Sequence, residues 1–201
     1  MEKYDVIIIG GGAAGLSCAL TLGSTENKFG WAKNRKYLVI DDDGSDLLQA
    51  RLFNVPGVKQ GITGRELIED MKNQLKAFKS VSFLQDKVVK LEGELNDFTV
   101  STESGKNFKA DRVVLATGMQ EFSIECKDAI IEPHDKVMKP NKIKIKNVDF
   151  KIKEGLYVAG LAAGSKTMFA IAAGDGVRVA CDIFEEWTGK YAVAHDSIRE
   201  K

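Results

Sequence analysis

IIIGGGAAG, residues 7–15, is the stretch that decides which fold we expect. It ends a short run, residues 4–9, that is apolar apart from Asp5 and is typical of a buried parallel strand. The residues that follow have helical character. Gly10, Gly12 and Gly15 therefore stand in the GxGxxG spacing directly between a strand and a helix. This order predicts the phosphate-binding turn of a dinucleotide-binding α/β fold.

Each glycine of this turn has a physical role. Gly10 permits a tight turn, Gly12 lets the backbone approach a pyrophosphate, and Gly15 allows close packing of helix on strand. The first N–H groups of the expected helix, at Ala13 and Ala14, have no partner within the helix and carry a partial positive charge, which suits an anionic phosphate. A flexible glycine turn without a ligand is the alternative interpretation.

The same fingerprint requires an acidic residue at the end of the second strand, where it binds the ribose hydroxyls. Residues 37–40 form a second apolar run, and Asp41 directly after it is the best candidate, with Asp42 second. Asp41 follows Gly15 by 26 residues, against the usual total of about 20, so we interpret residues 23–36 as an insertion between helix and strand. A carboxylate here disfavours a 2′-phosphate, which argues against NADP. A polar turn of three aspartates is the alternative.

Composition limits the classes of protein that remain. The chain has 201 residues, 44% of them hydrophobic, which is enough for one well-cored domain or two small ones. Lys plus Arg and Asp plus Glu number 29 each, so the net charge is zero and nucleic acid is not an expected partner. The apolar runs are far shorter than the roughly 20 residues of a membrane span, and the acidic N-terminus does not resemble a signal peptide. We therefore expect a cytoplasmic protein without a membrane partner.

The rest of the chain alternates between helical and strand-like patterns. Residues 62–78 contain an amphipathic helix that begins at a capping box formed by Thr63 and Glu66. Short alternating stretches across residues 81–114 predict a small antiparallel sheet. The other expected features are an apolar helix face of Leu67, Met71, Leu75 and Phe78, an alternating strand over 142–150, a buried strand over 156–159 and a long helix over 167–187.

Three further stretches carry a resemblance to a known family. NVPG, residues 54–57, is followed by GITGREL; ATG, residues 116–118, follows the apolar stretch RVVL; and GLYVAG, residues 155–160, is followed by AIAAGDG and a long helix. With the glycine turn, these stretches resemble, in the same order, the FAD domain of the thioredoxin-reductase-like flavoproteins, within the pyridine nucleotide-disulfide oxidoreductase superfamily. The resemblance covers most of the chain. It implies a Rossmann-like FAD-binding α/β domain, a parallel sheet flanked by helices with a small antiparallel sheet, and a homodimer.

The resemblance also implies which residues touch FAD. Asn54 and Ser45 would lie beside the flavin ring, the latter where many relatives carry glutamine, and Val88 would lie against the adenine. The family aspartate that binds the ribitol–phosphate part of FAD is replaced by Leu161, and the lost hydrogen bond from a charged group costs about 1.5–3 kcal/mol. The Arg-Gln pair usual near the flavin is replaced as well. The other implied contacts are Ala116, Thr117, Gly118, Gly160, Met168 and Phe169 (the replaced pair), and Ala170.

The start of the last long helix has a second expected role. Thr167 is the expected N-cap, which leaves the N–H groups of Phe169 and Ala170 free to point at the flavin ring. A helix N-terminus in this place would stabilise the negative charge of a reduced flavin. The apolar sequence MFAIAA is also typical of any buried helix start, which is the alternative.

The chain departs most from this family between the ATG turn and the closing stretch. Relatives carry an NADPH-binding domain there, usually with a CxxC disulfide, whereas here about thirty residues, 120–149, contain neither a second glycine fingerprint nor a CxxC pair. Even one βαβ unit takes about 30 residues. We therefore expect 120–150 to be a short connection within a single FAD-binding domain, residues 1–190, followed by a tail, 191–201. Thioredoxin reductase activity is not expected.

Few side chains are candidates for direct chemistry. Cys126 is the one catalytic candidate, against the alternative of an incidental thiol, and Cys18 and Cys181 are expected to lie in the core. His134 is a candidate proton donor, against the alternative of an exposed loop histidine. The lysine-rich run 136–153 predicts a strand with a solvated face, against the alternative of a docking surface for an acidic partner. Two histidines and three scattered cysteines leave no metal-binding cluster.

Three functions remain open on these grounds. The favoured one is an FAD-dependent oxidoreductase, a minimal thioredoxin-reductase-like flavoprotein that exchanges electrons with a separate redox partner protein or a small donor. The second is a non-catalytic FAD- or nucleotide-binding module that serves as a scaffold or flavin carrier. The third is an NAD-binding domain that uses only the first fingerprint, in which case the ATG and closing stretches have no purpose.

Overall fold

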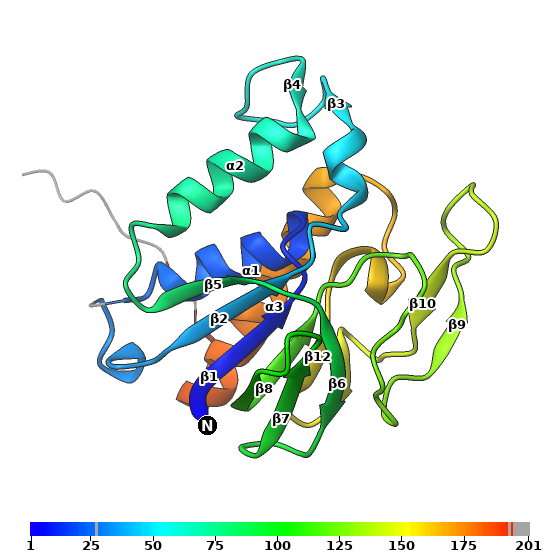
Figure 1. Ribbon diagram of the computed structural model, residues 1–201. Helices are drawn as coiled ribbons and strands as arrows, with labels where there is room; N and C mark the ends of the chain where they lie inside the picture. Colours follow the sequence, from blue (N-terminus) through cyan, green and yellow to red (C-terminus); the bar gives the residue numbers. More distant parts are fainter. Residues whose placement is uncertain (27, 193, 195–201) are drawn as a thin grey trace, which may run out of the picture.

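An eight-stranded mixed sheet lies at the centre of the molecule (Figure 1). The computed structural model describes residues 1–26, 28–192 and 194. The strands that form the main path of the sheet are β1 (Glu2–Ile9), β2 (Tyr37–Asp41), β5 (Val81–Gln85), β8 (Asn107–Leu115), β11 (Lys151–Lys153) and β12 (Leu156–Val158). Their order is β11-β12-β8-β1-β2-β5, and all neighbours on this path are parallel except β11 and β12. The expected Rossmann-like parallel sheet is thus confirmed.

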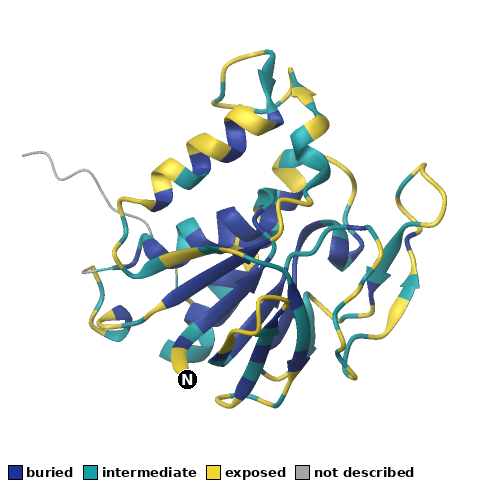
Figure 2. Ribbon diagram, viewed as in Figure 1, coloured by how far each residue is buried: buried dark blue, intermediate teal, exposed yellow. Residues whose placement is uncertain are grey.

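Side chains of β1 alternate between two hydrophobic cores. Val6 and Ile8 belong to the core shared with the helices, whereas Ile7 and Ile9 belong to the core on the other face of the sheet. None of the four is more than 4% exposed. A strand that is buried on both faces has few polar positions, which explains the continuous apolar run of residues 6–9. Asp5, ahead of that run, is half-buried and pairs with Arg35 at 2.6 Å. Figure 2 shows this central burial as dark blue strands.

Two helices pack closely against one face of the sheet. They are α1 (Ala13–Gly23) and α3 (Phe169–Thr188), and both match the expected helical stretches. A Cβ atom at Gly176 of α3 would lie only 2.0 Å from the carbonyl oxygen of Ala14 in α1. The glycine therefore lets the two backbones approach each other, and this contact fixes how the starts of the two helices lie relative to one another.

The third helix, α2 (Gly64–Leu75), begins as the sequence predicts. The Thr63 hydroxyl accepts a hydrogen bond from the Glu66 N–H at 3.2 Å, and the Glu66 carboxylate accepts one from the Thr63 N–H at 2.8 Å. This capping box satisfies two N–H groups that a helix start leaves free. Leu67, Met71 and Leu75 form the buried face as expected, whereas Phe78 lies beyond the end of the helix and is half-buried.

The expected antiparallel sheet over 81–114 is confirmed in part. β6 (Val88–Glu92), β7 (Phe98–Thr102) and the first half of β8 form an antiparallel meander, and β8 also pairs in parallel with β1 from Phe108 to Leu115. β5 contradicts the expectation, because it pairs in parallel with β2 at the edge of the sheet. An edge strand keeps exposed side chains such as Phe83, so its pattern resembles that of a half-buried antiparallel strand.

The connection over 120–150 forms a small hairpin outside the main sheet. β9 (Ile131–Pro133) and β10 (Ile143–Ile145) pair in antiparallel fashion. The strand expected over 142–150 is therefore wrong beyond Ile145, because a tight turn at Asp149 and Phe150, both with positive φ, separates β10 from β11. Figure 1 shows this hairpin standing beside the sheet on the side of β12.

Trp31 and Arg35, within the expected insertion, pack against the end of α3. The Trp31 ring contacts Phe184 and Trp187, with centroids 5.0 and 6.0 Å apart, and the Arg35 guanidinium lies 3.6 Å from the centroid of the Trp187 ring. No helix among the described residues is long and apolar enough to cross a membrane. The remaining short elements are η1 (Gly30–Ala32), η2 (Asp46–Gln49), β3 (Arg51–Leu52), β4 (Ile62–Thr63) and η3 (Gly160–Ala163).

Candidate cofactor-binding site

A cavity of about 750 Å³ opens at the carboxyl ends of β1, β2 and β8. Ligands of open α/β sheets bind at this edge of the sheet, and the volume lies within the range of about 300–1,000 Å³ that is common for cofactor sites. The cavity brings together most of the residues that the sequence predicts to bind a cofactor. Those that line it are Gly10, Gly12, Ala13, Ala14, Asp41, Asp42, Ser45, Val88, Ala116, Thr117, Gly118, Leu161, Met168 and Phe169.

The turn between β1 and α1 has no room for side chains. Gly10 has φ +109°, and a Cβ atom there would lie 2.3 Å from the carbonyl oxygen of Ala116. Gly15 does not line the cavity, but a Cβ atom there would lie 1.9 Å from the carbonyl oxygen of Gly10. The geometry thus agrees with a packing role for Gly15 and a turn role for Gly10.

The start of α1 presents free backbone donors to the cavity. The N-cap is Gly12, and the first hydrogen bond of the helix runs from the Leu16 N–H to the Gly12 carbonyl oxygen at 3.0 Å. The N–H groups of Ala13 and Ala14 precede that bond, and they have no acceptor within the part of the chain that the structure describes. Together with the positive end of the helix dipole, they suit a phosphate.

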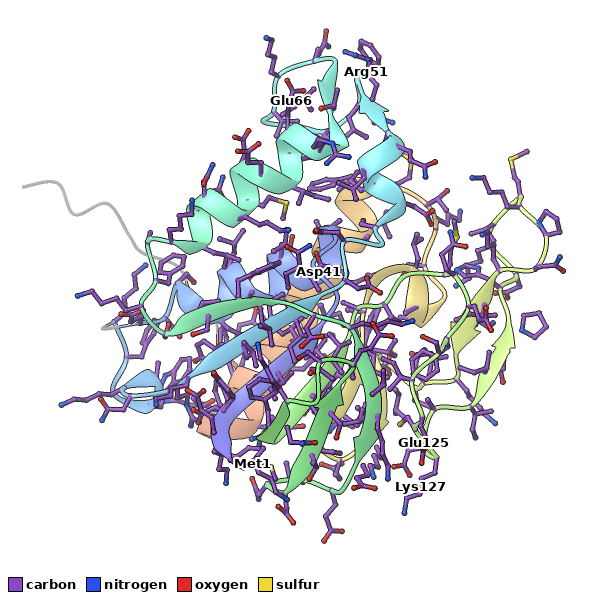
Figure 3. All side chains as sticks on the ribbon, in the orientation of Figure 1. Met1, Asp41, Arg51, Glu66, Glu125 and Lys127 are labelled. Atoms are coloured by element: carbon purple, nitrogen blue, oxygen red, sulfur yellow. The ribbon has the colours of Figure 1, made fainter. Side chains whose placement is uncertain are left out.

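Asp41 is the buried member of the three aspartates at the end of β2, and Figure 3 places it beside the start of α1. Its side chain is 5% exposed, Oδ1 accepts a hydrogen bond from the Gly11 N–H at 2.7 Å, and Oδ2 lies 3.6 Å from Lys72 Nζ. Burial raises the pKa of Asp41, and the Gly11 N–H and Lys72 partly oppose this rise. Asp42 is exposed and accepts a hydrogen bond from the Gly44 N–H.

The start of α3 reaches the same cavity from the other side. The expectation that Thr167 caps this helix is wrong, because the N-cap is Met168, which makes no side-chain capping bond. A hydrogen bond from the Met168 N–H to the Lys166 carbonyl oxygen at 2.8 Å forms a tight turn there, which leaves Thr167 one residue outside the helix. Met168 and Phe169 line the cavity, whereas Ala170 is exposed and does not.

The ATG turn and two other segments complete the walls. The Thr117 hydroxyl is buried, lines the cavity and has no hydrogen-bond partner among the described residues. Gly118 has φ +77°. The Ser45 hydroxyl accepts a hydrogen bond from the Leu47 N–H at 3.3 Å, so it faces its own loop as well as the cavity.

Other sequence candidates lie outside the lining. Asn54 is exposed, and Gly160 packs beneath Ala14, where an added Cβ would meet that residue at 2.8 Å; their contacts with a cofactor stay predictions. Cys126 is half-buried, and burial raises the pKa of its thiol. The alternative of an exposed loop histidine is wrong for His134, which is 9% exposed, and burial lowers its pKa.

The structure adds lining residues that the sequence analysis missed. Val137, Met138 and Lys139, in the loop between β9 and β10, reach the cavity. Gln120 and Asp46 line it as well and bond to each other: the Gln120 amide donates to both oxygens of Asp46, at 2.7 and 2.8 Å. The Gln120 carbonyl oxygen accepts a hydrogen bond from Lys142 Nζ. Among these residues, only Gln120 could have been predicted from the sequence to lie near the cavity, because it follows the ATG turn by two residues.

The cavity offers polar groups at several places along its walls. The cavity has free N–H donors at its middle, a buried carboxylate at one end and a second helix start at the other. An unpartnered buried hydroxyl at Thr117 is a further group that a ligand would satisfy. Three lining residues depart from what the resemblance implies: Leu161 stands where a carboxylate is implied, and Met168 and Phe169 stand where an Arg-Gln pair is implied. The fold and the position of the cavity define an α/β protein of the Rossmann-like class.

Comparisons with known proteins give the family. The chain matches the family of pyridine nucleotide-disulphide oxidoreductases over residues 4–160. It is 32% identical over 123 residues to a thioredoxin reductase from Aquifex aeolicus (strain VF5), which covers 60% of this chain and 35% of that protein. It is 31% identical over 126 residues to a ferredoxin–NADP reductase from Bradyrhizobium sp. (strain BTAi1 / ATCC BAA-1182). This match also covers 60% of this chain and 35% of that protein.

The chain therefore belongs to the pyridine nucleotide-disulphide oxidoreductase family. A solved thioredoxin reductase from Gloeobacter violaceus shares the fold, with a TM-score of 0.75 at 17% identity, covering 99% of this chain and 100% of that chain. The matched segments span about a third of the length of the two curated relatives named above. Residues among the described part of the chain form no group of three or more potential metal ligands.

Proposed function

We propose that this chain binds FAD and works as an oxidoreductase of the thioredoxin-reductase-like type. One observation carries the proposal: a single cavity connects the free N–H groups at the start of α1 with the start of α3. A bound dinucleotide long enough to touch both ends satisfies donors that otherwise face only water. NAD bound through the first turn alone leaves the second helix start and the ATG turn without a role.

The residues of the cavity divide the binding task. The N–H groups of Ala13 and Ala14 would hold the pyrophosphate, Asp41 would accept hydrogen bonds from the ribose hydroxyls, and Val88 would pack on the adenine. The start of α3 at Phe169 would face the flavin ring and favour negative charge there. The cofactor supplies the electron-transfer chemistry, and the protein supplies binding, orientation and electrostatics.

The electron donor and acceptor belong to this proposal too. The segment 120–150 holds only a small hairpin and no second glycine turn, so we propose residues 1–190 as one FAD-binding domain that exchanges electrons with a separate redox protein or a small donor. Similarity to proteins named thioredoxin reductase and ferredoxin–NADP reductase supports a redox partner of that kind. We further propose that the protein is a homodimer in the cytoplasm. We also propose that it has no thioredoxin reductase activity of its own, since the sequence has no CxxC pair.

The direct test is the visible spectrum of the purified protein, followed by titration of the apo-protein with FAD, FMN and NAD. We expect a flavin spectrum and a clear preference for FAD, because FMN lacks the adenosine that Asp41 and Val88 would hold. A folded protein that stays colourless and refuses added FAD contradicts the proposal. Tighter binding of NAD than of FAD would favour the NAD-binding alternative instead.

A second function, a non-catalytic FAD-binding module, is favoured by Leu161. Loss of a charged partner at this position weakens FAD binding. Weaker binding of the flavin suits a protein that carries and releases FAD. The two functions separate in stopped-flow experiments with the FAD-loaded protein: an oxidoreductase is reduced and reoxidised repeatedly by redox proteins or NAD(P)H, whereas a carrier keeps its flavin oxidised with every donor tried. Rapid reduction by NADPH alone would contradict the separate partner that we propose.

A further inference from the structure

Lys72 of α2 lies at the adenosine end of the cavity without lining it. Its Nζ atom is 3.6 Å from Oδ2 of Asp41 and 3.2 Å from Oδ1 of Asp43, and it lies 4.4 Å from the centroid of the Phe83 ring. The Asp43 carboxylate is held in turn by the Gln85 amide at 2.6 Å. The ammonium group thereby contacts the carboxylate from α2, and Asp41 lines the cavity whereas Lys72 does not.

Lys72 offsets the negative charges that lie near Asp41. Asp42 and Asp43 follow in the same loop, and both disfavour a negative charge on Asp41, as burial does. Across the turn after β5, the Asp86 carboxylate accepts hydrogen bonds from Ser104 and from the Lys87 N–H, so it is satisfied elsewhere. Lys72 and the Gly11 N–H are the groups that oppose protonation of Asp41.

We propose that Lys72 is a positioning residue for nucleotide binding: it keeps the Asp41 carboxylate charged and oriented so that both ribose hydroxyls can donate to it. A carboxylate has about four lone-pair sites, and the Gly11 N–H occupies one of them. Lys72 approaches from α2, so the face of Asp41 toward the cavity stays open. The inference rests on the proposed FAD function, and it names a residue that acts on FAD only through Asp41.

The test measures the dissociation constant of FAD from pH 5.5 to 8.5 by flavin fluorescence. In Lys72→Met we expect binding about tenfold weaker than in the wild type at the acid end, with the loss shrinking as pH rises, because Asp41 protonates more readily without the lysine. Lys72→Arg keeps the charge and should restore the wild-type pH profile. Lys76→Met is the matched control, since Lys76 is exposed at the C-cap of the same helix and its Nζ donates to the Asn73 side-chain oxygen, away from Asp41.

A double-mutant cycle shows whether Lys72 acts through Asp41. Asp41→Asn alone should weaken FAD binding, and adding Lys72→Met to it should weaken binding no further. A loss in Lys72→Met that is equal at every pH, or that adds fully to the loss in Asp41→Asn, overturns the inference. Thermal melting of each apo-variant identifies any that fail to fold. If Lys72→Met does not fold, the pH profile of FAD binding in Lys72→Arg tests the inference: a profile unlike that of the wild type contradicts it.

A second readout does not need FAD. The pKa of Asp41 in the apo-protein can be followed by carboxyl carbon-13 NMR, and Lys72→Met should raise it while Lys76→Met leaves it unchanged. If the wild type binds no FAD, the proposed function fails, and the NMR titration still decides whether Lys72 controls the charge of Asp41. If the wild type binds FAD but Asp41 titrates identically in Lys72→Met, only the inference fails.

Discussion

The two ends of the cavity differ in how firmly the protein has built them. At the adenosine end, Gly10 and Gly15 pack backbone against backbone, and Asp41 is buried with two partners. At the flavin end, Met168 is 44% exposed, and Met138 in the hairpin loop is fully exposed. The comparison indicates that the groups proposed to bind the nucleotide are buried and closely packed, while those proposed to surround the flavin ring are more exposed and depart from the family pattern.

This difference has a physical cause. Phosphates and ribose are recognised by backbone N–H groups and one carboxylate, which require fixed geometry and tolerate little change. The ring end depends on side chains that decide which partner approaches and how negative charge is stabilised. A change such as Leu161 in place of a carboxylate alters that end without disturbing the sheet, because Leu161 lies in the short η3 segment that follows β12.

The largest effect should come from breaking the rigid end. In Gly15→Ala the added methyl group meets the carbonyl oxygen of Gly10 at 1.9 Å, so the turn must move. We expect the free energy of unfolding to fall by about 2–3 kcal/mol and FAD binding to become undetectable. Chemical denaturation and an FAD titration measure the two effects.

Gly30→Ala is the matched control for that substitution. Gly30 lies in η1 with nothing within 4 Å of an added Cβ and without a positive φ, so stability and FAD affinity should stay close to the wild type. Wild-type FAD affinity in Gly15→Ala would show that the turn does not hold the cofactor.

The next effect should come from repairing the open end. Leu161→Asp puts back the carboxylate that the family resemblance implies, and we expect FAD to bind about tenfold more tightly, in line with the roughly 1.5–3 kcal/mol of a charged hydrogen bond. Leu161→Asn introduces an amide of nearly the same shape as the aspartate carboxylate but without its charge, so it should raise FAD affinity less. Isothermal titration calorimetry at pH 7.5 compares the three proteins. Weaker binding in Leu161→Asp would mean that the ribitol–phosphate part of FAD lies elsewhere.

The same contrast explains what the sequence could predict. The rigid end has local signals: the glycine spacing, the apolar run of β1 and the aspartate after β2 all follow from backbone geometry, and the structure brings these residues to one cavity. The edge strand β5 was assigned to the wrong sheet, because half-exposed strands show the same alternation in parallel and antiparallel sheets.

The open end has fewer such signals: the ATG and closing stretches pointed to Thr117, Met168 and Phe169, which line the cavity, but nothing pointed to the hairpin. Gln120 meets Asp46 across 74 positions of sequence, and Val137 to Lys139 reach the cavity only because β9 and β10 fold into a hairpin beside it. These contacts depend on tertiary packing of segments without a motif. The N-cap of α3 was also out of reach of the sequence. Thr167 is a favourable N-cap residue, but a tight turn there makes Met168 the N-cap instead.

A smaller effect should come from loosening the hairpin at the open end. Gln120→Ala removes the amide that joins Asp46 on one wall to Lys142 at the start of β10. A net hydrogen bond contributes about 0.5–1.5 kcal/mol, so we expect FAD to dissociate about threefold faster. Amide hydrogen exchange should also accelerate at His134, whose N–H bonds to the Lys142 carbonyl oxygen at 2.8 Å.

Lys146→Ala controls for general effects on the hairpin. Lys146 is exposed, and its backbone N–H bonds to the Ile130 carbonyl oxygen at 2.8 Å, a contact that the substitution leaves in place. Equal exchange rates in Gln120→Ala and the wild type would mean that the hairpin is held by its backbone bonds alone.

The smallest effect should come from Cys126, the one thiol that the sequence analysis considered for catalysis. It lies outside the cavity lining and is half-buried, and burial raises the pKa of its thiol above the ordinary value. Since the thiolate is the reactive form, Cys126 should be a poor nucleophile near neutral pH, and its alkylation by iodoacetamide should accelerate as pH rises toward 10. Cys126→Ser should change flavin reduction and reoxidation less than about twofold. A tenfold loss of turnover with unchanged FAD affinity would instead place this thiol in the electron path and move part of the chemistry away from the open end.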